Sequence, residues 1–374
     1  MKGIFVALIV VGSVALGAGA VIVGYHYVVK GRNNEPLVSN RHNIEEQIKD
    51  FDIDTDTANI EITKANDGKG LVVCEEKEKI YHDVTVEDGL LKIRTVDTRK
   101  WYERWFFNFN FKPMKITIYL PDTDCESLKC TSSTGSLEVA SDFTFTSVKA
   151  TASTGSIKLN NKVSGEIDVK ASTGSVSIKD STATSLKAKA STGSVNVKNT
   201  EVTGDVNLEA STGSVNVENI KCANFNAKTS TGSFNGTEIE ATGDAYIEGS
   251  TGSSKVTTIK CQNLTIKHSI GGATLEDVQC EDLTVRASTG DVKLTNAIAN
   301  NKMDIKTSTG DVIFKDSDAA SLKIITDTGD VKGNFLSPKI VYFDSDTGHG
   351  KYPKETSGGV CDIKTDTGNA NLTW

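Results

Sequence analysis

The chain is poor in the features by which enzymes, disulfide frameworks and nucleic-acid-binding proteins are recognised. It has 5 prolines in 374 residues, 6% aromatic side chains, and a net charge of −8 with no basic stripe, which argues against a nucleic-acid partner. Its 7 cysteines cannot all pair within one chain, and neither they nor the 5 histidines follow the spacing of a metal motif. Nucleophile-elbow, phosphate-loop and zinc-hydrolase motifs are also absent, so we expect a protein that is not an enzyme and needs no organic cofactor.

One long hydrophobic run stands at the N-terminus, after a short tail of residues 1–3. Residues 4–25 carry no charged side chain, and a helix of this length reaches about 33 Å, close to the thickness of the hydrocarbon core of a bilayer. A cleaved signal peptide is the alternative, because Ala18-Gly19-Ala20 looks like a cleavage site. The apolar run continues past that site, so we expect a transmembrane helix or signal anchor over residues 4–29.

The remaining two thirds of the chain repeat at a short period. A triplet ending in glycine recurs every 19 or 20 residues, nine times as Ser-Thr-Gly, once as Ser-Ile-Gly and three times as Asp-Thr-Gly. Asp-Thr-Gly is also the signature of aspartic proteases, but here it stands in the phase of Ser-Thr-Gly, and Ser and Asp are both good turn residues. The triplets end at Gly135, Gly155, Gly174, Gly193, Gly213, Gly232, Gly252, Gly271, Gly290, Gly310, Gly329, Gly348 and Gly368.

The flanks of each triplet alternate between apolar and polar residues. Small or apolar side chains stand seven and five residues before each glycine, mostly with a polar one between them, and the alternation resumes two and four residues after it. A period of two with one apolar face is typical of a β-strand, and a unit this short buries that face only by stacking on identical units. The sequence therefore predicts an all-β, single-stranded β-solenoid of about thirteen rungs over residues 128–374.

The same template begins before the regular part. Phe51 and Ile53 precede an Asp56-Thr57-Ala58 triplet, and Ala58 lies 77 residues before Gly135, which is close to four periods. We therefore expect irregular rungs and an aromatic cap over residues 51–127, joined to the membrane segment by a linker at residues 30–50.

The stretch Ile116–Cys130, "ITIYLPDTDCESLKC", leads into the Ser-Thr-Gly rungs, and in this the chain resembles the putative-adhesin β-strand repeat family. The resemblance covers roughly residues 45–374. It implies a bacterial envelope protein behind a membrane segment, with an adhesin-like role or a role in the response to envelope stress, and it brings no catalytic residues. The positive charges on the two sides of residues 4–29 give no clean orientation and lean against export. From the resemblance we expect a single-pass protein of the cell membrane with an extracytoplasmic solenoid.

Acidic residues gather at the last rungs. Three follow the triplet glycine and three precede the Thr, and carboxylates about 5 Å apart along one edge repel each other unless a hard cation such as Ca²⁺ binds them. Solvated turn residues are the alternative. The candidate Ca²⁺ ligands are Asp291, Asp311, Asp330, Asp327, Asp346 and Asp366.

A cluster of aromatic side chains interrupts the chain at "WYERWFFNFNF". Such a patch can contact membrane or a partner, and it can also cover the end of a solenoid. The candidate contact residues are Trp101, Trp105, Phe107, Phe109 and Phe111.

These features favour a membrane-anchored repeat protein of the bacterial envelope that binds a cell-surface glycan or protein through repeated polar edges. The alternative is a membrane-tethered scaffold of the bactofilin kind, which polymerises by stacking of solenoid ends. The C-terminal sequence "NANLTW" favours self-association, because no polar cap follows Leu372 and Trp374.

Overall fold

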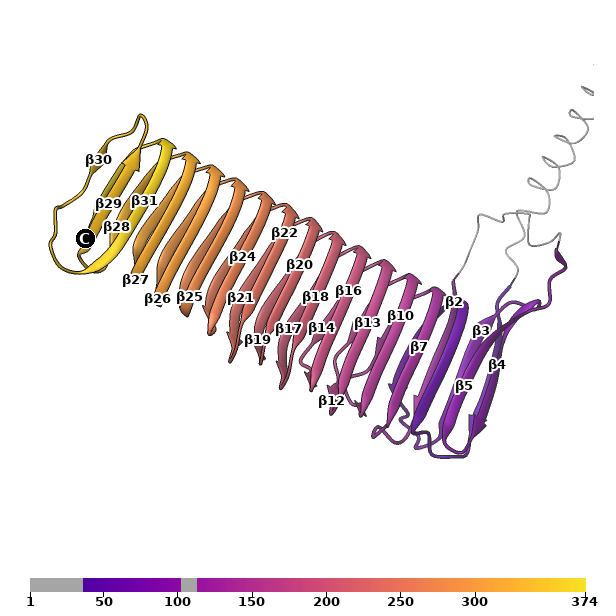
Figure 1. Ribbon diagram of the computed structural model, residues 1–374. Coiled ribbons are helices and arrows are strands. Elements are labelled where there is room, and N and C mark those ends of the chain that lie inside the picture. Colours follow the sequence, from indigo (N-terminus) through magenta and orange to yellow (C-terminus); the bar gives the residue numbers. More distant parts are fainter. Residues whose placement is uncertain (1–35, 102–112) are drawn as a thin grey trace, which may run out of the picture.

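The computed structural model describes residues 36–101 and 113–374, whose named elements are all β-strands of one 32-stranded sheet. The sheet coils into a straight rod, as Figure 1 shows. This is the β-solenoid that the repeat predicts. Within the described residues no helix is long and apolar enough to cross a membrane, and the predicted membrane segment at residues 4–29 lies outside them.

Each rung of the regular part has the same plan. In one example β13 (Glu166–Thr173) ends at the triplet, the chain turns at Gly174, β14 (Val176–Lys179) follows, and β15 (Thr182–Ala183) completes the rung. The other strands of this part are β7 (Ser127–Thr134), β8 (Leu137–Val139), β9 (Thr144–Phe145), β10 (Ser147–Thr154), β11 (Ile157–Leu159), β12 (Lys162–Val163), β16 (Ser185–Thr192), β17 (Val195–Val202), β18 (Val206–Thr212), β19 (Val215–Cys222), β20 (Phe225–Thr231), β21 (Phe234–Ala241), β22 (Ala245–Thr251), β23 (Ser254–Lys260), β24 (Asn263–Ile270), β25 (Ala273–Thr289), β26 (Val292–Thr309), β27 (Val312–Thr328) and β28 (Val331–Phe335).

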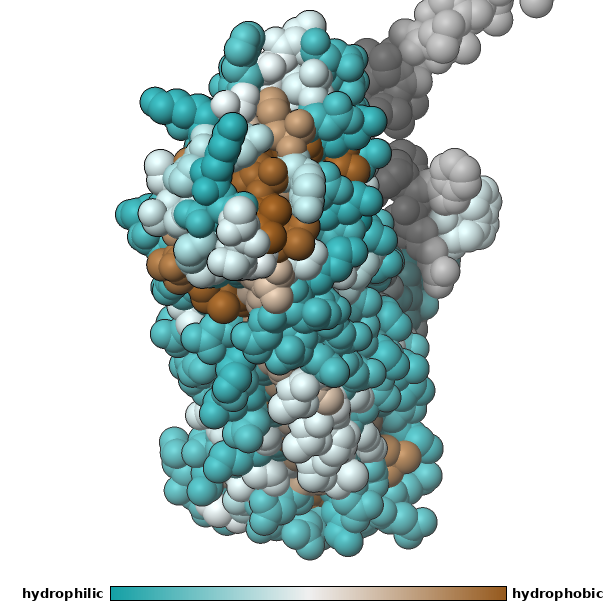
Figure 2. All heavy atoms as spheres, turned by 60° about the vertical axis from the view of Figure 1, so that its left-hand side comes forward, coloured by the Kyte–Doolittle hydropathy of each residue, from teal (hydrophilic) through white to brown (hydrophobic). Residues whose placement is uncertain are grey.

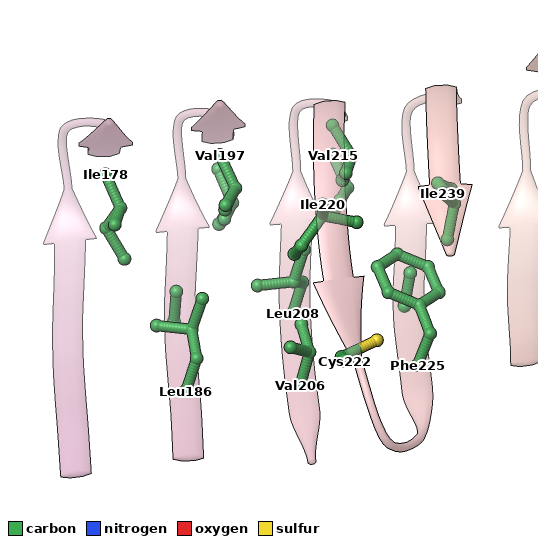
Figure 3. Close-up of a cluster of buried hydrophobic side chains, with 14 of the residues drawn as sticks. Ile178, Leu186, Val197, Val206, Leu208, Val215, Ile220, Cys222, Phe225 and Ile239 are labelled. Carbon is green, nitrogen blue, oxygen red and sulfur yellow. The ribbon is translucent and has the colours of Figure 1, made fainter. Parts of the chain in front are cut away.

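Successive rungs pair in parallel and in register. Ile167 lies opposite Val148 on one side and Leu186 on the other, so each column of the repeat becomes a ladder along the rod. The apolar columns point inward, and Figure 3 shows Leu186, Val206 and Phe225 stacked on successive rungs. All three are at most 1% exposed. Burying a side chain of this size stabilises the fold by about 1.5–3 kcal/mol, so the stacked columns supply the core that a single rung lacks.

A corner that the sequence did not predict lies six residues after the triplet glycine. The residue there has a positive φ of 47 to 62° in eight rungs, and it is mostly Asp or Asn, the side chains that best tolerate the left-handed conformation. The third corner lies before the next long strand. The αL residues are Asp180, Asn199, Asn219, Glu238, Thr258, Asp277, Asn296 and Asp316.

The N-terminal end differs from the irregular rungs expected there. β2 contains the Asp56-Thr57-Ala58 triplet and pairs directly with β7 and β8, so no rung separates Ala58 from Gly135. The intervening residues form antiparallel strands instead: β3 adds to β6 and β1 to β3 on one face, and β4 adds to β5 on the other. These strands are β1 (Val38–Ile44), β2 (Asp50–Lys64), β3 (Gly70–Glu76), β4 (Ile80–Glu87), β5 (Leu90–Asp97) and β6 (Met114–Leu120).

The C-terminal end is not in sequence order. β31 (Gly359–Thr367) pairs with β27 on one side and with β29 (Lys339–Ser345) on the other, and β32 (Ala370–Thr373) lies between β28 and β30 (Gly350–Lys351). The rung of Gly368 is therefore inserted between the rungs of Gly329 and Gly348. The sequence predicted that residues 359–374 form the outer, uncovered rung. This is wrong, because β29 and β30 cover them.

Candidate functional site

The edge that carries the triplets is a ladder of side-chain oxygens. In most rungs the residue after the triplet accepts a hydrogen bond from the backbone N–H of its counterpart on the next rung, with distances between 2.8 and 3.3 Å, and Gly272, which has no side chain, interrupts the ladder. Ser175 accepts from Ser194 in this way, and Asp311 accepts from Asp330. Serine and aspartate therefore accept the same backbone hydrogen bond at this position, which explains why one replaces the other.

Two of the three aspartates that follow a glycine also form ion pairs. Asp291 forms an ion pair with Lys293 at 3.4 Å, and Asp311 accepts a hydrogen bond from Lys332. Lys332 and the backbone N–H of Asp330 hold the pKa of Asp311 below its ordinary value. Carboxylates held in this way are stabilised in the charged form without a metal ion.

The aspartates that precede the Thr remain exposed to solvent. Asp327, Asp366 and Asp346 lie in this order along the edge, because the rung of Gly368 is inserted. Among the described residues the six candidate ligands do not bring three carboxylate oxygens within 4.8 Å of one another. Calcium binding at this edge stays a prediction for titration.

The predicted aromatic site is described only at its start. Trp101 is 75% exposed, whereas Trp105, Phe107, Phe109 and Phe111 lie outside the described residues.

A second apolar surface, which the sequence did not predict, lies at the C-terminal end of the rod. Leu336 and Tyr342 are 57% and 60% exposed, and Phe343, Tyr352 and Trp374 are partly buried against the core. Figure 2 shows the hydrophobic surface gathered at this end. Among the described strands β29 pairs with β31 alone, so its other edge offers free backbone N–H and C=O groups. We call this surface, Leu336 and Tyr342 with the free edge of β29, the C-terminal face.

The seven cysteines are buried and unpaired. Burial raises the pKa of each thiol to about 12, so the six outside the cluster of Cys74 serve as small core residues rather than reactive thiols. This agrees with the sequence interpretation of Cys125, Cys222, Cys261 and Cys280 as small hydrophobic residues beside a corner.

A buried polar cluster lies in the N-terminal end and was also missed. Cys74 and Glu76 point inward from β3, and His82 points inward from β4, all at most 2% exposed. Oε2 of Glu76 accepts a hydrogen bond from the backbone N–H of His82 at 2.7 Å and lies 2.9 Å from Nδ1 of the same residue. Asn40 on β1 donates to Oε1. The spacing Cys-x-Glu-x₅-His matches no familiar motif, so this buried cluster cannot be predicted from the sequence.

The sides of the rod offer little room for a substrate. A hollow of about 310 Å³ lies over β8 and β11, lined by residues such as Glu61, Glu138 and Lys158. Lys158 and Glu138 form an ion pair at 3.2 Å and are more than half exposed. Exposed ion pairs of this kind contribute little to the free energy of unfolding.

The Toastrack DUF4097 family matches residues 48–209 and 202–373, so the chain belongs to this family, a putative-adhesin repeat family of unknown function. The resemblance drawn from the sequence is thereby confirmed. No curated protein matches the chain.

The chain is also similar to several solved structures. A putative adhesin from Bacteroides fragilis NCTC 9343 is 17% identical over 70% of this chain and 98% of its own, with a TM-score of 0.35. A putative adhesin from Parabacteroides merdae ATCC 43184 is 13% identical over 82% and 98%, with a TM-score of 0.34. A putative lipid binding protein from Parabacteroides distasonis ATCC 8503 is 16% identical over 80% and 97%, with a TM-score of 0.25.

Proposed function

We propose that the protein is a non-enzymatic, membrane-anchored rod of the bacterial cell envelope that presents a binding surface at its C-terminal face. Residues 4–29 anchor the chain, and the solenoid holds the C-terminal face at the end of the rod opposite the N-terminal strands. The partner is a cell-surface protein or glycan, and the role is adhesin-like. The family and the names of similar proteins support this role, and the uniform rungs, which build no deep cleft, support the absence of catalysis.

The observation that carries the proposal is the C-terminal face itself. Large apolar side chains exposed at the end of a rod are unusual unless something covers them, because a monomeric protein seldom exposes such patches without a function. An open strand edge beside them adds main-chain hydrogen bonds to any extended partner that docks there.

The test compares a double variant, Leu336→Ser with Tyr342→Ser, with the matched control Ile270→Thr. Ile270 is 58% exposed on the triplet edge, so the control removes a similar apolar surface from the side of the rod. We expect the double variant to abolish attachment of cells to the partner surface, and the control to attach normally. Equal attachment by both variants would show that the C-terminal face is not the binding surface.

A separate experiment tests on which side of the membrane the solenoid lies. A protease added to intact cells is expected to cleave the solenoid, since we place it outside the membrane. Full protection on intact cells and cleavage after lysis would place the solenoid in the cytoplasm.

The free edge of β29 favours one alternative, a scaffold in which rods stack end to end. Electron microscopy of residues 36–374 distinguishes the two proposals, since stacking gives filaments whereas a binding module gives single rods. Filaments that disappear in the Leu336→Ser, Tyr342→Ser variant would establish the scaffold.

A further inference from the structure

We propose that Cys74, Glu76 and His82 bind a divalent cation of the Zn²⁺ class at the N-terminal end of the rod. One donor atom from each of the three side chains lies within 4.8 Å of the other two, and the three side chains are fully buried. This is the one group of three such ligands among the described residues. The site is independent of the partner proposed for the C-terminal face.

The first argument is charge. Glu76 is 1% exposed, and the one basic side chain that the described residues pair with it is His82, whose pKa is lowered by burial, so no full positive charge faces the carboxylate. A buried carboxylate is costly unless a positive charge compensates it. Zn²⁺ with one thiolate, one carboxylate and one neutral imidazole has a net charge of zero, so the metal removes the cost that the apolar surroundings impose.

The second argument is geometry. Zn²⁺ binds sulfur at about 2.3 Å and nitrogen or oxygen at about 2.0–2.2 Å, so tetrahedral ligands stand about 3.4–3.8 Å apart. The Nδ1 atom of His82 and Oε2 of Glu76 are 2.9 Å apart, as a hydrogen bond requires. Because the three donor atoms already lie within 4.8 Å of one another, side-chain rotations replace the shared proton by the metal, and the Cys74 thiol releases its proton to solvent as it becomes a thiolate ligand.

The third argument is an unused nitrogen on the neighbouring strand. Nε2 of His42 is buried and has no hydrogen-bond partner. His42 lies on β1 opposite Val72, two residues from Asn40, which lies opposite Cys74. Residues opposite each other in an antiparallel pair share a face of the sheet, so His42 lies diagonally across from Cys74. Its imidazole lies outside the group of three donors within 4.8 Å of one another, so His42 becomes a fourth ligand only when its ring turns toward Cys74.

A metal held by these three side chains links two strands from two faces of the rod. Cys74 and Glu76 belong to β3, which pairs with β1, whereas His82 belongs to β4, which pairs with β5 on the opposite face. β3 is the only strand partner of β1 among the described residues. The metal therefore ties β4 to the strand that holds β1 in the sheet.

The experiment uses the full-length chain in detergent, freed of metal with a chelator and then given Zn²⁺ alone. We expect one Zn²⁺ per chain by elemental analysis. Co²⁺ in its place is expected to give a near-ultraviolet sulfur-to-cobalt charge-transfer band, which reports a thiolate ligand. A folded chain that takes up no Zn²⁺ overturns the proposal.

The variants Cys74→Val and Glu76→Gln preserve the shape of the interior, and each is expected to lower Zn²⁺ affinity by more than about 100-fold. His42→Gln is expected to lower it by about 10–100-fold. Cys130→Val is the matched control, because Cys130 is 3% exposed in the same core and has no Glu or His beside it in the cluster. Unchanged affinity in Cys74→Val contradicts the proposal.

Circular dichroism shows whether each variant folds. If Glu76→Gln does not fold, the cobalt spectra of the wild-type chain, Cys74→Val and Cys130→Val decide. The proposal requires the charge-transfer band in the first and third and not in the second, and any other pattern overturns it.

Discussion

Along the triplet edge, one side-chain oxygen per rung makes the hydrogen bond that recurs between most neighbouring rungs. Whether it comes from Ser175, Asp311 or Asn369, it accepts one backbone N–H from the next rung in space. The Asp-Thr-Gly triplets are therefore structural variants of Ser-Thr-Gly. The sequence phase was sufficient for this interpretation, whereas the hydrogen-bond partner itself requires the stacked neighbour, which only the structure supplies.

The triplet glycine is the residue with the least freedom to change. A Cβ at Gly193 would lie 2.2 Å from the carbonyl oxygen of Gly174, at a φ of 132° that L-residues rarely adopt. We expect Gly193→Ala to lower the free energy of unfolding by about 4 kcal/mol or more, measured by urea denaturation. Gly68→Ala is the control, since φ is also positive there but no atom lies within 4 Å. A cost of only about 1 kcal/mol at both positions would show that strain, not the close approach, fixes the triplet glycine.

Buried histidines make stability depend on pH. Burial lowers the pKa of His268 below its ordinary value of about 6.5, while Nε2 shares a hydrogen bond with Ser254 at 2.7 Å. Above about pH 6.5 neither the folded nor the unfolded state is protonated, so the histidine has no effect. Below it the unfolded state binds the proton first, and stability falls by up to about 1.4 kcal/mol per pH unit for each such group.

Burial also lowers the pKa of His82, so the metal-free wild-type chain carries a second group of this kind. We expect urea midpoints to fall between pH 7.5 and pH 5, and to fall less in His268→Gln. An equal fall in both proteins would mean that His268 does not contribute.

At the scale of one strand, Lys339 fixes the start of β29. Its side chain is 2% exposed, pairs with Asp318 and donates to the carbonyl oxygen of Ala319 at 2.8 Å. Removing one partner of such a buried pair costs about 3–5 kcal/mol, so Lys339→Ala is expected to destabilise the C-terminal rungs by about 3 kcal/mol. Lys364 is the control, because its pair with Asp344 is exposed, and Lys364→Ala is expected to cost less than about 1 kcal/mol. Thermal unfolding of both variants measures the difference.

The sequence predicts where the long strands lie, but not which strands pair at the two ends of the rod. Alternation predicted the long strands and their inward faces, because that pattern is local. The αL corner at residues such as Asn199 is indicated in the sequence by a column of Asp and Asn, six residues after the triplet glycine. The sequence pattern does not show which strands lie next to β2 and β31. The 77 residues between Ala58 and Gly135 are close to four periods, so the pattern looks continuous although β2 pairs directly with β7. The rung inserted at β31 follows the same template as its neighbours, so it also leaves the periodicity unchanged. Pairing between distant segments depends on chain paths that periodicity does not encode.

At the scale of the whole molecule, the order of the last rungs makes two truncations differ in an unusual way. Deleting residues 359–374 removes the only strand partner that β29 has among the described residues, whereas deleting residues 336–374 leaves β27 and β28 as an intact end. We expect the shorter deletion to be the more disruptive, with residues 339–351 cleaved by a protease at low concentration. The longer deletion is expected to give a protease-resistant rod. Resistance of residues 339–351 in the shorter deletion would mean that β29 re-pairs directly with β27.

The inserted rung also sets a time order during synthesis. Parallel rungs from β7 to β28 can pair one after another as they leave the ribosome, because each neighbour has already emerged. Residues 339–345 are different, since their partner, residues 359–367, emerges later. The C-terminal face therefore forms only after the segment beneath it has been translated, and a chain released early carries the rod without the surface at its end.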